Sequence, residues 1–161
     1  MKSADPLLAW TASRWFNTDE ALAPESLRGR VIVLHTFQML CPGCVMHGVP
    51  QAQRVHQTFN ERDVAVVGLH TVFEHHAVMT PEALEVYIHE NRLRFPIGVD
   101  APTPGHDVPQ TMAAWGLQGT PSLLLADRRG RLRVKHFGQL DDLALGAMIG
   151  QLMAEPRDGA N

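Results

Sequence analysis

Two short runs of the chain are almost entirely apolar, and both are predicted to be strands. Residues 31–37 read VIVLHTF and residues 64–69 read VAVVGL, and both runs are rich in β-branched side chains. A strand with one face in water alternates apolar and polar residues, whereas a strand buried on both faces is nearly continuously apolar, as in parallel sheets. The pattern therefore predicts a parallel sheet that is covered on both sides.

The other segments predict helices and further strands. A short strand is expected at 95–100, and a β-hairpin at 122–126 and 132–137 around a turn that ends in glycine. Proline at 42 suits the first turn of a helix, Thr80 suits a helix cap, and Gly116 suits a helix end. The predicted helices are 42–59, 80–91, 108–115 and 141–153.

This order of elements predicts an α/β protein in which a central mixed sheet is flanked by helices on both faces. The sequence contains no fixed-period repeat and no low-complexity tract, so its 161 residues are expected to form one domain. Residues 1–24 are expected to be an N-terminal extension, 25–153 the core and 154–161 a flexible tail. Trp10 and Trp15 are expected to cover one edge of the core.

Composition and charge narrow the range of partners. Apolar residues make up 45% of the chain and charged residues 19%, which is ordinary for a globular protein. The net charge of -3 gives no broad attraction to nucleic acid, which is not an expected partner. No apolar run approaches the ~20 residues of a membrane span, and no signal-peptide pattern is evident. A cytoplasmic location is expected if Met1 is native, and a periplasmic one if a leader was trimmed.

The only two cysteines form a Cys-Pro-Gly-Cys motif at 41–44, between a predicted strand and a predicted helix. A helix amino end carries roughly half a positive charge and therefore stabilises a thiolate. Cys41 is expected to attack a disulfide, and Cys44, one turn further and more sheltered, to resolve the mixed disulfide. Because Pro42 and Gly43 are uncharged, the motif does not determine the direction of electron transfer.

Two other uses of the cysteine pair remain open, namely reduced buried cysteines and half of a metal site. Haem attachment is excluded because Val45 follows Cys44 where a histidine is needed. Nine histidines are present, but they are mostly expected in surface loops. The cysteines together with His47 cannot surround a tetrahedral ion from one helix start. No metal and no cofactor is therefore predicted, and no role is assigned to the cluster of His70, His75 and His76.

Distant motifs give the chain a family resemblance. It resembles the TlpA-like or redoxin branch, related to AhpC/TSA proteins, of the thioredoxin superfamily over about residues 25–153. The motifs that carry the resemblance are CPGC at 41–44, Phe95-Pro96, WGLQGTPS at 115–122 and DRRG at 127–130. The resemblance implies a thioredoxin-like fold in which Pro121 is a cis-proline that faces the dithiol. It also implies a substrate site at Thr120, Pro121, Pro42 and Gly43, with the Thr120 backbone offered to an extended substrate segment.

Three positions depart from the family pattern. Leu40 replaces the tryptophan that usually precedes the first cysteine, and His35 replaces a buried acid. His35 is a possible proton acceptor for Cys44, because a histidine pKa lies in the working range, although a hydrogen-bonded core histidine fits equally well. Pro50 follows Cys44 by six residues rather than five, which predicts a bulge or a shifted kink in the helix.

The sequence thus predicts a thiol-disulfide oxidoreductase that acts on protein or small-molecule disulfides with an unidentified electron donor or acceptor. One alternative is a thiol peroxidase of the peroxiredoxin type. Peroxiredoxins place a threonine three residues before the reactive cysteine and a proline four residues before that threonine, where this chain has Gln38 and Leu34. The other alternative is a non-catalytic, redox-sensing binding module with a thioredoxin-like fold.

Overall fold

The two central strands of the sheet are those that the apolar runs predicted. The computed structural model describes residues 5–157, and in it β2 (Val31–Phe37) and β3 (Val64–His70) pair in parallel over their whole length. Strand β4 (Ile97–Asp100) continues the parallel sheet on the far side of β3. Every residue of these strands is buried, as expected for strands with both faces covered.

A hairpin completes one side of the sheet. Strand β5 (Ser122–Ala126) is fully buried and pairs antiparallel with β2, and β6 (Leu132–Phe137) pairs with β5 at the edge. Gly130 has a φ of 77° in the connecting turn, a conformation that favours glycine. The order β1-β4-β3-β2-β5-β6 gives one mixed sheet, which confirms the predicted fold class.

The opposite edge is a strand that the sequence analysis did not predict. Strand β1 (Ala12–Phe16) lies within the expected N-terminal extension and pairs antiparallel with β4. Its sequence, ASRWF, is short and has a polar middle, so the usual signals of a buried strand are missing. Trp10 and Trp15 pack against the second of two core clusters, on the face of the sheet that this segment helps to cover.

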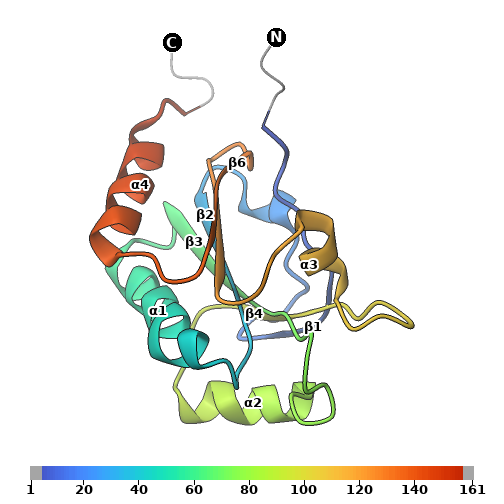
Figure 1. Ribbon diagram of the computed structural model, residues 1–161. Helices are drawn as coiled ribbons and strands as arrows, with labels where there is room; N and C mark the ends of the chain where they lie inside the picture. The colour runs from blue at the N-terminus through green and yellow to red at the C-terminus, as the bar shows by residue number, and fades with distance from the viewer. Residues whose placement is uncertain (1–4, 158–161) are drawn as a thin grey trace.

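Helices cover the sheet on both faces (Figure 1), and each face has its own hydrophobic core. Helices α1 (Val49–Thr58), α2 (Pro81–Glu90) and α4 (Asp142–Ala154) contribute to the larger core. The 3-10 turn η1 (Pro24–Leu27) and α3 (Gln110–Trp115) lie on the opposite face, where Leu27 and Trp115 join the smaller core. Within residues 5–157, no helix is long and apolar enough to span a bilayer.

The helix ends show why the predicted boundaries were nearly right. The Thr80 side chain accepts a hydrogen bond from the Ala83 N–H, and Asp141 caps α4 in the same way. Helix α3 begins at residue 110 rather than at the predicted 108, because Pro109 takes the cap position. The predicted tail begins where α4 ends, and residues 158–161 of it, like residues 1–4 of the predicted extension, lie outside the described residues.

Strand register brings three loops to one end of the sheet. Thr36 near the end of β2 pairs with Ser122 at the start of β5, and Phe37 pairs with His70 at the end of β3. The segment after β2, the segment after β3 and the segment before β5 therefore join the sheet at neighbouring points. For this reason the cysteine motif, the loop after β3 and the segment that contains Pro121 meet at this end of the sheet, although they are far apart in the sequence.

Candidate active site

The cysteine motif lies at the junction between β2 and the helix that follows. Pro42 is the first helical residue, and Cys44 begins the π-helical turn η2 (Cys44–Gly48), which continues into α1. Both cysteines are free thiols. Cys41 is partly exposed, whereas Cys44 is fully buried, so a substrate can reach only Cys41 without a rearrangement.

Backbone groups surround both sulfur atoms. The Cys44 N–H donates to Cys41 Sγ at 3.4 Å, a contact that stabilises negative charge on that sulfur. The same sulfur lies 3.4 Å from the carbonyl oxygen of Thr120. The Gln38 N–H donates to Cys44 Sγ at 3.5 Å. The dithiol therefore contacts both the segment that leads into it and the segment that precedes β5.

The Cys44 thiol resists ionisation. Its pKa is raised to about 12, mainly by burial and also by the hydrogen bond and charge of the neighbouring Cys41, while hydrogen bonds from Thr120 and Gln38 act in the opposite direction. Cys44 is therefore a neutral thiol near pH 7. Two of the effects that raise its pKa depend on Cys41, so they change when Cys41 reacts.

The Thr120–Pro121 peptide bond is cis, as the family resemblance implied. Pro121 packs against two glycines of the helix that carries the dithiol. A Cβ atom on Gly48 would lie 2.9 Å from Pro121 Cβ, and one on Gly43 would lie 3.3 Å from Pro121 Cδ. Side chains at these two positions would push the proline segment away, so the glycines allow its close approach to the cysteines.

The helix contains the predicted bulge. A π-helical turn accommodates one extra residue, and η2 supplies it directly after Cys44. Pro50, which has no N–H to donate, stands second in α1, just after this turn. The extra residue explains how Pro50 can lie one position further from Cys44 than in the thioredoxin pattern while the helix continues to residue 58.

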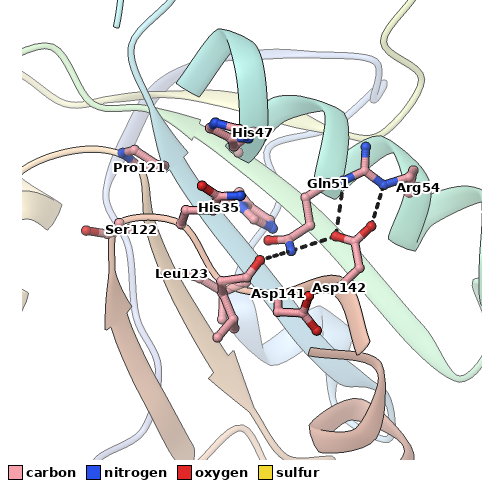
Figure 2. A pocket seen from close by; sticks show the side chains of 13 residues that line it. His35, His47, Gln51, Arg54, Pro121, Ser122, Leu123, Asp141 and Asp142 are labelled. Carbon is pink, nitrogen blue, oxygen red and sulfur yellow. Dashed lines mark hydrogen bonds and ion pairs between the residues drawn. The ribbon is translucent and has the colours of Figure 1, made fainter. Parts of the chain in front are cut away.

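A pocket of about 250 Å³ opens beside Pro121, between α1, the start of β5 and the segment that leads into α4. Figure 2 shows His35, His47 and Gln51 among its walls. Gln51 donates to the Leu140 carbonyl oxygen at 2.7 Å and to Asp142, which also pairs with Arg54 at 2.7 Å. The ion pair between Arg54 and Asp142 and the hydrogen bonds of the Gln51 amide thus join α1 to the start of α4 and to the segment that leads into it, on this side of the pocket.

His35 is buried and lines this pocket together with Pro121. Neither ring nitrogen has a hydrogen-bond partner among the described residues. Burial lowers its pKa to about 4. The imidazole is therefore neutral near pH 7 and has a free lone pair.

Sequence reasoning missed the importance of Gln38, which it considered only as a departure from peroxiredoxins. Its side chain is buried, and Nε2 lies 3.4 Å from both Glu74 Oε1 and Thr120 Oγ1. Its Oε1 accepts from the Phe73 N–H at 3.3 Å. Gln38 thus joins the loop after β3 to the Thr120 segment. No sequence motif indicates this, because the partners come from two distant loops.

The other expectations had mixed outcomes. His70 is not a surface loop histidine: it ends β3, is buried, and accepts a hydrogen bond from the Met39 N–H at 3.1 Å, whereas His75 and His76 are exposed. Burial lowers the pKa of His70 to about 4. Leu40 is 55% exposed beside Cys41. Within residues 5–157, no group of three or more His, Cys, Asp or Glu side chains is arranged to hold a metal ion.

Comparisons with known proteins give two extensive matches among solved structures. A protein described as thioredoxin-like superfamily is 51% identical over 96% of this chain and 99% of that chain, with a TM-score of 0.92. A thiol-disulfide isomerase from Corynebacterium glutamicum is 54% identical over 94% of this chain and 98% of that chain, also with a TM-score of 0.92.

A more distant structure shares the fold. A putative thiol:disulfide interchange protein DsbE from Chlorobium tepidum is 18% identical over 94% of this chain and 96% of that chain, with a TM-score of 0.72. No family model matches the chain, and no curated protein is similar to it.

Proposed function

This chain belongs to the thioredoxin-like superfamily, and we propose that it is a thiol-disulfide oxidoreductase that uses the Cys41–Cys44 dithiol. The observation that carries the proposal is the pairing of a partly exposed Cys41 with a fully buried Cys44 at a helix start, beside a cis-proline. The similarity to the C. glutamicum thiol-disulfide isomerase supports the same chemistry. The substrate is a protein or small-molecule disulfide.

In the reducing direction, the Cys41 thiolate attacks one sulfur of the substrate disulfide. A mixed disulfide forms, and the other substrate sulfur leaves as a thiolate that takes up a proton. The Cys44 N–H, 3.4 Å from Cys41 Sγ, supports the attacking charge. The backbone of the partly exposed Thr120, including its carbonyl group, is proposed to align an extended substrate segment beside the sulfur, with Pro42 and Gly43 forming the other wall.

Cys44 then attacks Cys41 Sγ, which releases the second substrate thiol and leaves a Cys41–Cys44 disulfide. Cys44 must lose its proton in this step. In the mixed disulfide, Cys41 has no charge and no thiolate, so two of the effects that raise the Cys44 pKa are removed and burial remains. The loss of the Cys41 charge and hydrogen bond therefore favours this order of the two attacks, because Cys44 becomes easier to ionise only after Cys41 has reacted.

His35 is proposed as the proton acceptor for Cys44. Its neutral imidazole has no partner and lies beside Pro121, in the pocket that borders the start of α1. Because the pKa of the Cys44 thiol is raised to about 12 and that of His35 is lowered to about 4, complete proton transfer in the resting dithiol is strongly unfavourable. The transfer is therefore proposed to accompany the attack on the mixed disulfide, when the developing sulfur charge passes into the new bond.

Two cysteine variants test the proposed function in an insulin-reduction assay driven by dithiothreitol, with mass spectrometry of acid-quenched samples. Wild type is expected to reduce insulin faster than the reductant alone. Cys41→Ser is expected to abolish this and to form no adduct, because the buried Cys44 cannot meet substrate. Cys44→Ser is expected to accumulate a mixed disulfide on Cys41.

One competing function, the redox-sensing binding module, gives a different result in the same assay. A wild-type protein without activity, whose dithiol nevertheless oxidises and re-reduces, would favour the binding module. An adduct on Cys44 rather than Cys41 would contradict the assigned roles. The electron donor or acceptor that recycles the dithiol in the cell is a separate partner, and the reduction potential of the pair would give the favoured direction of transfer.

A further inference from the structure

The carboxylate of Glu74 is connected to the Cys41 thiol through contacts of Gln38 and Thr120. Glu74 is exposed in the loop after β3, and its Oε1 lies 3.4 Å from Gln38 Nε2. The same amide group lies 3.4 Å from Thr120 Oγ1, and the Thr120 carbonyl oxygen lies 3.4 Å from Cys41 Sγ. A chain of three contacts therefore connects the negative charge to the sulfur.

The bridging residue fixes this arrangement. Gln38 is only 1% exposed, and its Oε1 accepts from the N–H of Phe73, the residue before Glu74. The amide therefore binds both the backbone and the side chain of this loop. The Glu74 carboxylate is thereby positioned at the rim of the proposed substrate site while its outer side remains open to solvent.

The exposed side chains close to the cysteines in sequence are apolar. Leu40 is 55% exposed, Val45 42% and Met46 68%, and Pro42 next to Cys41 is also exposed. None of these four carries a charge or a hydrogen-bonding side chain. They can pack against the carbon chain of a substrate, but they cannot distinguish its charge. The Glu74 carboxylate can, and the contacts through Gln38 and Thr120 connect it to Cys41.

We propose that Glu74 makes the site selective for disulfides with a positive charge next to the sulfur atoms. The inference rests on the proposed function and names its substrate class: an amine, or a lysine or arginine side chain, one to a few bonds from the cystine. Unit charges about 4 Å apart in water change a rate constant about fivefold, and salt screens the effect. A cationic disulfide is therefore expected to react about fivefold faster, and an anionic disulfide about fivefold slower, than it would without the Glu74 charge.

Three small disulfides test the charge selectivity in single turnovers of the reduced protein: cystamine, which is cationic, hydroxyethyl disulfide, which is neutral, and dithiodipropionate, which is anionic. In each turnover the dithiol is oxidised to the Cys41–Cys44 disulfide, and the substrate is reduced to two thiols. Rates are divided by those of dithiothreitol with the same disulfides. The wild-type ratio of cystamine to dithiodipropionate is expected to fall about twentyfold in Glu74→Gln and to invert in Glu74→Lys.

The matched control is Glu25→Gln, which removes an equal charge from an exposed residue in η1, before the opposite end of β2. It is expected to leave every ratio unchanged. Paired disulfide peptides with lysine or glutamate beside the cystine separate the two sources of positive charge. A larger preference among the peptides identifies a protein substrate, and a larger preference among the small disulfides identifies a small amine.

The failure of this inference can be told apart from the failure of the proposed function. Charge selectivity is wrong if hydroxyethyl disulfide reacts rapidly with wild type but Glu74→Gln leaves the ratio of cystamine to dithiodipropionate unchanged at low salt. The proposed function itself is wrong if wild type reacts with all three disulfides no faster than dithiothreitol does.

Discussion

The side chain of His35 is buried at a cost, because an unpartnered polar group inside a protein destabilises the fold by about 1–3 kcal/mol. A proton-accepting role would explain why an imidazole rather than an apolar side chain stands there. His35→Asn is then expected to slow the second step, the attack of Cys44 on the mixed disulfide, by about a hundredfold. Rapid acid quenching and mass spectrometry of the adduct follow this step directly.

The first step supplies the control for this prediction. In a Cys44→Ser background the reaction stops after Cys41 has attacked, and the proposed acceptor has no proton to receive. His35→Asn is expected to leave that rate unchanged and to alter the pH dependence of the second step alone. Equal slowing of both steps would instead indicate a structural role for His35.

At the residue scale, the sequence identified the groups that carry a motif. Cys41 and Cys44 could be predicted from residue type and spacing, and Pro121 from the family resemblance. Gln38 and Glu74 could not be predicted, because their place in the site depends on contacts between loops that are far apart in the sequence. The orphaned state of His35 was also invisible, since it depends on which side chains surround the ring in space.

At the scale of elements, the turn η2 allows a direct test of the extra residue in the helix. Deletion of Met46, which is 68% exposed, removes one residue from the π-helical turn and lets it become α-helical without rotating α1. This variant is expected to fold with a free energy of unfolding within about 1 kcal/mol of wild type. Urea unfolding followed by circular dichroism measures the difference.

Deletion of Gln53, which is partly exposed, is the matched control, since it removes one residue from the regular part of α1. An α-helix turns by about 100° per residue, so this deletion rotates the face after residue 53, including buried Val55, away from the sheet. It is expected to prevent cooperative folding. If the two deletions destabilised the protein equally, η2 would not be the site of a removable residue.

Element prediction succeeded where one strong signal controls an element. Continuous apolar runs gave β2 and β3, and proline, threonine and glycine gave helix ends to within two residues. Strand β1 was missed because its pairing with β4 comes from tertiary contacts and not from an apolar pattern. The bulge was predicted only through the family spacing of Pro50, because nothing in CVMHG itself favours a π turn.

At the scale of the whole molecule, the site depends on how the loops converge. The order of the strands was expected to place parallel and antiparallel pairs in one sheet, but register could not be read from the sequence. The pairing of β2 with both β3 and β5 sets the cysteine segment beside the Glu74 loop and the Thr120 segment. The arrangement of the site therefore depends on the stability of the folded sheet. His35 and His70 make that stability depend on pH.

His35 and His70 are both buried as neutral imidazoles, and burial lowers the pKa of each from 6.5 to about 4. Between these values the unfolded chain binds a proton on each histidine and the folded protein does not. Stability is therefore fully present above pH 6.5 and is lost as the pH falls toward 4, by up to about 1.4 kcal/mol per pH unit for each histidine. Urea unfolding between pH 7.5 and about 4.5 measures this slope.

Substitution of each histidine separates the two contributions. His35→Asn and His70→Asn are each expected to remove about half of the histidine-dependent slope, and the double variant nearly all of it, whatever their effect on stability at pH 7.5. The pKa of Asp100, which burial raises, contributes in the opposite direction, but it is common to all four proteins and cancels in the comparison. An unchanged slope in the double variant would mean that the acid sensitivity of this fold resides in its carboxylates instead.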